Sequence, residues 1–129
     1  MILAIDPGKD KCGLAVLDED AKVIEKAVFG SREITPQVLR FVSKYNPAAV
    51  VIGAGSFGKE AEKALLQAGL KANLVFISEK NSSWLARRRY WEENPPSGWW
   101  KFIPTSLRVP PVPVDDYAAV ILAERYLKK

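Results

Sequence analysis

Residues 1–18 of the chain read MILAIDPGKDKCGLAVLD, the pattern of two strands joined by a tight turn. A short apolar run over 1–5 ends in the turn-forming triplet Asp6-Pro7-Gly8, and a second apolar run covers 13–18. Along residues 23–29, the side chains alternate between two faces in the pattern of a third strand. Three consecutive strands joined by short turns predict an antiparallel meander. The faces expected of the third strand are Val23, Glu25, Ala27 and Phe29 on one side, and Ile24, Lys26 and Val28 on the other.

The pattern changes after this meander. Thr35 is the expected N-cap of a helix with Pro36 at its first position, and Asn46-Pro47 should end that helix. The apolar runs at 48–52 (AAVVI) and 74–78 (LVFIS) predict buried parallel strands. Further helices are expected over 56–69, from Ser82 or Ser83 to about Glu93, and from Asp115 or Asp116 to the C-terminus.

This order predicts an α/β fold in a single domain over residues 1–129. The sheet should be mixed and five-stranded, with the three-strand meander beside two parallel strands and helices on both faces. Residues 94–114 interrupt the pattern, since they hold six of the nine prolines together with Trp99 and Trp100. We expect a long ordered loop there, which would clamp a substrate or form a dimer contact.

Composition restricts the chemistry. The 129 residues include no histidine and one cysteine, so a Ser-His-Asp triad, a histidine-ligated zinc site and an internal disulfide are all excluded. Cys12 is expected to be a small packed residue. Asp6 comes too early for a signal peptide and no apolar run approaches the length of a membrane span, so we expect a cytoplasmic protein with no membrane partner.

The net charge of +4 is concentrated in one segment. Residues 80–91, KNSSWLARRRYW, hold four basic residues and no acidic one, and all four tryptophans lie in or near this segment. Cations neutralise phosphates and aromatic rings stack on bases, so the segment suits nucleic acid. The alternative is a solvated helix face whose tryptophans are core. The expected backbone contacts are Lys11, Lys80, Arg87, Arg88 and Arg89.

Three consecutive arginines cannot share one helix face, because successive residues turn by about 100°. We therefore expect at most two of Arg87, Arg88 and Arg89 to contact the same strand of nucleic acid. The remaining one should pack or pair internally.

Several acidic residues lie at the ends of predicted strands or at the start of a predicted helix, where one edge of the sheet would bring them together. Asp6 ends the first strand, Glu79 follows the last strand, and Asp115 and Asp116 open the final helix. The carboxyl ends of parallel strands share one edge, where sites of open α/β sheets form. Converging carboxylates repel one another unless a divalent cation neutralises them, which predicts Mg²⁺ or Mn²⁺. Each acid also has a simpler interpretation, as a turn former, a helix cap or a surface charge.

The opening motif IDPGKDKCGLAV resembles the first hairpin of the YqgF/RuvX family. That family comprises Holliday junction resolvases and pre-16S rRNA nucleases with a ribonuclease H-like fold. Gly53 matches the glycine that ends the family's next strand, Ser78-Glu79-Lys80 matches its Asp-Glu-Arg motif with a serine for the first acid, and DDYAAVILAERYL resembles its final helix.

The resemblance implies a ribonuclease H-like nuclease that cuts a four-way DNA junction or precursor rRNA by a two-metal mechanism. Asp6, Glu79 and Asp115 take the places of the catalytic and metal-binding acids, with Asp116 as an extra ligand, and Lys11 that of the usual arginine. Resolving a symmetric junction would require two sites, hence a homodimer. The alternative is a non-catalytic nucleic-acid-binding or protein-interaction module that retains the fold.

A competing motif lies at Gly53–Lys59, GAGSFGK, which matches the spacing of a phosphate-binding P-loop. Glu60 stands where such a loop needs a serine or threonine, and its charge would repel phosphate. The simpler interpretation is a tight strand-to-helix turn. An intermediate hypothesis is that Ser56, Lys59 and the helix N-terminus hold a phosphate of nucleic acid.

Overall fold

The computed structural model of the protein describes residues 1–78, 80, 82–94 and 115–128. Its five strands form one sheet in the order β3-β2-β1-β4-β5. β1 pairs antiparallel with β2 and parallel with β4, so the predicted mixed sheet of a meander and two parallel strands is confirmed. The strands are β1 (Ile2–Asp6), β2 (Lys11–Leu17), β3 (Val23–Gly30), β4 (Ala49–Gly53) and β5 (Leu74–Ile77).

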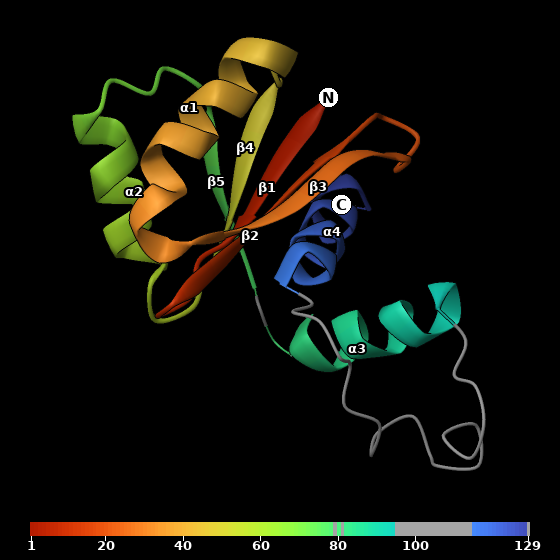
Figure 1. Ribbon diagram of the computed structural model, residues 1–129. Coiled ribbons are helices and arrows are strands. Elements are labelled where there is room, and N and C mark those ends of the chain that lie inside the picture. Colours follow the sequence, from red (N-terminus) through yellow and green to blue (C-terminus); the bar gives the residue numbers. More distant parts are fainter. Residues whose placement is uncertain (79, 81, 95–114, 129) are drawn as a thin grey trace.

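Helices cover both faces of this sheet, as predicted (Figure 1). α1 (Ile34–Tyr45) and α2 (Gly58–Gln67) lie on one side, and α4 (Asp115–Leu127) lies on the other. α3 (Ser82–Glu93) packs on α4. The expected loop at 94–114 falls, apart from Asn94, outside the described residues. No helix within the described ranges is long and apolar enough to cross a membrane.

The period of two along the strands divides the core between the two faces. Even-numbered residues of β1, such as Ala4, pack beneath α4, whereas odd-numbered ones, such as Leu3 and Ile5, pack beneath α1 and α2. In β4, Ala49 and Val51 face α4. The same alternation places Asp6 and Gly53, at the carboxyl ends of their strands, on the α4 side.

The predicted start of α1 is wrong by two residues. A 3-10 turn over Ser31–Glu33 runs directly into the helix, and Glu33 rather than Thr35 is its N-cap. The Ser31 hydroxyl donates a hydrogen bond to the Gly8 carbonyl at 2.9 Å, which anchors this turn on the β1–β2 hairpin. Pro36 is tolerated because the first four helical amides lack intrahelical acceptors anyway. The predicted end is confirmed, since Asn46 is a left-handed C-cap.

The predicted faces of β3 hold only for part of the strand. Between Val16 and Leu17 of β2 the register shifts, so that Val16 pairs with Glu25 and Leu17 with Val23. The bulge leaves Ile24 unpaired and 41% exposed, and it turns Val23 to the α4 face while Ala27 and Phe29 face α1. A bulge of this kind reverses the alternation on one side of the extra residue.

β5 is not the buried strand that its apolar sequence predicts. It is an edge strand, in which Leu74 and Val75 are half-buried and Phe76 is 37% exposed. Periodicity cannot distinguish a central from an edge position for so short an apolar run, because only the strand order decides it.

Candidate active site

The carboxyl edge of the sheet brings Asp6 and the start of α4 together. Asp6 lies opposite Gly13 in the β1–β2 register. Gly13 in turn lies directly under the helix start, because a Cβ atom on it would come within 1.9 Å of the Asp115 carbonyl oxygen. Only glycine permits this approach, so the sequence of β2 lets α4 begin beside Asp6.

The environment of Cys12 places both acids nearby. The pKa of this thiol is raised from 9.0 to about 11, mainly by burial and to a smaller extent by the charges of Asp115 and Asp6. The expected packed cysteine is therefore confirmed, since Cys12 is fully buried and its thiol is protonated at neutral pH. The charges of Asp6 and Asp115, from distant parts of the chain, therefore both act on the Cys12 thiol.

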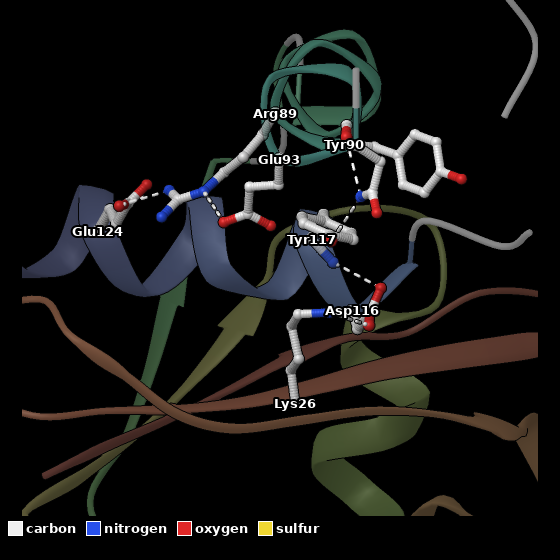
Figure 2. Close-up of polar contacts among 8 residues, drawn as sticks. Lys26, Arg89, Tyr90, Glu93, Asp116, Tyr117 and Glu124 are labelled. Carbon is white, nitrogen blue, oxygen red and sulfur yellow. Dashed lines mark hydrogen bonds and ion pairs between the residues drawn. The ribbon is translucent and has the colours of Figure 1, made fainter. Parts of the chain in front are cut away.

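Asp116 points elsewhere, although it was expected as an extra ligand. Its Oδ2 lies 3.0 Å from the Lys26 Nζ of β3, and its Oδ1 accepts a hydrogen bond from the Tyr117 amide (Figure 2). Burial alone lowers the pKa of Lys26, but the hydrogen bond and charge of Asp116 outweigh it and raise that pKa. The Asp116 carboxylate thus holds together β3 and the first turn of α4.

Glu79, expected as the third acid, lies outside the described residues, but its neighbours are held firmly. Arg125 of α4 donates hydrogen bonds to the Ser78 carbonyl at 2.6 Å and to the Lys80 carbonyl at 2.5 Å. Among the residues that the structure describes, no three acidic or cysteine side chains come close enough to hold a metal ion. Of the three acids expected to hold a metal, only Asp6 and Asp115 lie among the described residues, and carboxylate oxygens are ligands that suit a hard cation.

The P-loop resemblance at Gly53–Lys59 is limited to the order strand, loop, helix. The Ala54 amide donates to the Ile77 carbonyl, and the Gly58 amide donates to the Gly55 carbonyl, so both serve the fold. A Cβ on Gly58 would come within 2.5 Å of the Gly53 carbonyl oxygen. These contacts favour the tight-turn interpretation.

A small pocket nevertheless opens at this turn. It has a volume of about 200 Å³, and Ser56, Lys59 and the exposed Phe76 line it together with Ala54 and Gly55. It lies at the carboxyl ends of β4 and β5, the same edge that carries Asp6. The geometry is compatible with the expected phosphate contact of Ser56 and Lys59.

The three arginines of α3 divide as the helix geometry predicts. Arg89 turns inward, where its Nη1 lies 2.6 Å from Glu124 Oε2 of α4 (Figure 2). Arg87 and Arg88 are exposed, and Arg88 pairs with Glu92 one turn later at 3.3 Å. The expected contacts Lys11 and Lys80 also have exposed side chains.

Sequence reasoning missed three residues that organise this region: Lys26, Glu124 and Arg125. A signal existed for Lys26, which the alternation of the third strand places on the same face as Val28, beneath an expected helix layer. Glu124 and Arg125 carried no such signal, because their partners lie 35 or more positions away in the chain.

Comparisons with known proteins agree with this architecture. No protein-family model and no curated protein matches the chain. Solved structures do match: RuvC of T. thermophilus in complex with a Holliday junction substrate is 15% identical, with a TM-score of 0.60 over 95% of this chain and 88% of RuvC. Another structure of Thermus thermophilus RuvC is 18% identical, with a TM-score of 0.55 over 95% of this chain and 89% of that one. The chain therefore has the ribonuclease H-like fold that RuvC also has.

Proposed function

We propose that the protein is a metal-dependent nuclease, similar to the YqgF/RuvX family, that cuts structured nucleic acid. The observation that carries this proposal is that the backbone of Asp115 lies against Gly13, the residue opposite Asp6 in the sheet. The RuvC match, in which the relative holds a Holliday junction, supports a branched substrate. A four-way DNA junction and a folded precursor rRNA are the substrate classes to compare.

In this proposal, Asp6, Asp115 and Glu79 hold Mg²⁺ or Mn²⁺. A bound divalent cation supplies activation of water and stabilises the leaving oxygen of a phosphodiester. The residues of this chain bind and orient the substrate. The substrate phosphates are neutralised by Lys11, Lys80, Arg87 and Arg88. One further phosphate is held at the N-terminus of α2 by Ser56 and Lys59. Asp116, held by Lys26, takes no direct part.

Titration calorimetry with Mn²⁺ tests the metal site. We expect the wild type to bind and both Asp6→Asn and Asp115→Asn to lose binding, since each substitution removes a charged oxygen ligand. Asp20→Asn, in the β2–β3 turn, is the matched control and should bind as the wild type does. If the wild type does not bind Mn²⁺ at millimolar concentration, the proposed metal site is refuted.

A cleavage assay on four-way junctions, linear duplexes and structured RNA tests the activity. Cleavage that Asp6→Asn abolishes supports the nuclease and identifies its substrate class. Equal cleavage by wild type and Asp6→Asn would show a contaminant. Tight binding of a junction without cleavage, at saturating Mn²⁺, would instead favour the non-catalytic binding module.

A further inference from the structure

Lys26 stands at an unusual place for a lysine. It lies in the middle of β3 on the sheet face that α4 covers, and its side chain is 31% exposed. Its Nζ contacts Asp116 at 3.0 Å and lies 4.1 Å from the centroid of the Tyr117 ring. Both partners belong to the first turn of α4, immediately after Asp115 (Figure 2).

Asp116 needs this partner. Its side chain is only 14% exposed, and a carboxylate so far removed from water is costly unless it is paired and hydrogen-bonded. Lys26 provides the opposite charge for Oδ2, while the Tyr117 amide provides a donor for Oδ1. The two contacts together fix the direction of the Asp116 side chain and the rotation of the first helical turn.

The same turn is held from its other side. Tyr117 is 7% exposed and packs edge-on against Tyr90 of α3, with ring centroids 5.9 Å apart. The Asn94 amide lies within 3.5 Å of the Tyr117 hydroxyl. Lys26 therefore adds a side-chain contact from the sheet to a helix start that is also held by backbone contact with Gly13 and by packing on α3.

We propose that Lys26 is a positioning residue: by holding Asp116 toward β3, it fixes the first turn of α4 so that Asp115, and not Asp116, serves the cation. This inference rests on the proposed function. A purely electrostatic role predicts the opposite sign, because removing a positive charge near a cation site strengthens cation binding. Loss of positioning weakens it.

The test is Mn²⁺ affinity by calorimetry in Lys26→Met, Asp116→Asn and the double variant. We expect each single change to weaken binding by roughly tenfold, as substitutions of groups that orient metal ligands do. The double variant should be no weaker than the single ones, because both act through one contact. Lys26→Arg should retain most of the affinity, since it keeps the charge.

Two controls separate positioning from simple loss of stability. Lys22→Met removes an exposed lysine from the neighbouring turn and should not weaken binding. Phe41→Leu loosens the core on the opposite sheet face, so it should lower the urea midpoint while leaving Mn²⁺ affinity unchanged. Should Lys26→Met fail to fold, Lys26→Thr decides, because threonine suits a strand and the change also removes the positive charge, so that the electrostatic and positioning roles still predict opposite signs.

The outcomes distinguish the two proposals. In one outcome the wild type binds Mn²⁺ and Asp6→Asn does not, while Lys26→Met binds Mn²⁺ at least as tightly as the wild type. This outcome overturns the role of Lys26 and leaves the proposed metal site intact. Absence of Mn²⁺ binding in the wild type overturns the metal site and the role of Lys26 together.

Discussion

Gly13 is the residue on which the geometry of the site depends. Its missing side chain lets the backbone of Asp115 lie against β2 at the position opposite Asp6. A methyl group there would also come within 2.8 Å of the Asp116 amide nitrogen. Both obstructing groups are backbone atoms of a helix start, which cannot rotate away as a side chain can. The helix itself must therefore move.

We expect Gly13→Ala to destabilise the protein by about 1–3 kcal/mol, the usual cost of overpacking, and to weaken Mn²⁺ binding at least as much as Lys26→Met does. Urea unfolding and calorimetry measure the two effects. Gly30→Ala is the matched control, because a Cβ on Gly30 would meet nothing within 4 Å. Unchanged Mn²⁺ affinity in a folded Gly13→Ala protein would contradict the role given to this approach.

At the scale of elements, α4 connects the parts of the site. Its first turn carries Asp115, its middle packs on β1 and β2 through residues such as Ala119 and Leu122, and its last turn carries Arg125. The guanidinium of Arg125 bridges the carbonyls of Ser78 and Lys80, the two neighbours of Glu79. One helix thus holds two chain segments that supply proposed ligands.

Arg125→Met should weaken Mn²⁺ binding several-fold, because the segment around Glu79 loses two hydrogen bonds to a charged group. The cost in stability should be only about 1 kcal/mol at this exposed position. Arg125→Lys should recover the loss in part, since one ammonium group lacks the planar fork that spans two acceptors. Calorimetry gives the affinities, with Lys128→Met as the control. Wild-type affinity in Arg125→Met would refute this anchoring role.

At the scale of the whole molecule, the exposed cations decide how nucleic acid is held. Arg87 and Lys59 have exposed side chains, whereas Arg89 is bound between α3 and α4 by Glu124. Exposed and internal cations should therefore behave differently when they are removed. The net charge of +4 alone does not distinguish them.

The salt dependence of junction binding measures this difference. Arg87→Ala and Lys59→Ala should each reduce the slope of log affinity against log salt concentration by about 1, the loss of one phosphate contact. Arg89→Ala should leave the slope nearly unchanged and instead lower stability by about 1 kcal/mol. Lys71→Ala, before the start of β5 and thus at the opposite edge of the sheet, should change neither. An unchanged slope in Lys59→Ala would contradict the proposed contact between Lys59 and a phosphate at the start of α2.

Much of the architecture could be predicted from local patterns. The run IDPG, the alternation of β3 and the apolar residues 48–52 are short-range signals, and they were enough to predict a mixed sheet of a meander and two parallel strands, with Asp6 at a strand end. The start of α1 could not be predicted, because Ser31 is anchored to Gly8 across the hairpin. The edge position of Phe76 and the bulge at Ile24 likewise depend on neighbouring strands.

The amino-acid composition restricts the chemistry available to this protein: with no histidine and one cysteine, the proposed site is built from carboxylates. The sequence by itself also determined that Asp6 and Asp115 begin or end an element, since turn and cap preferences are local. Only the tertiary structure decided which of two adjacent aspartates serves the fold. Asp116 meets Lys26 because β3 and α4, 90 positions apart, lie on the same face of the sheet, and no local pattern encodes that contact.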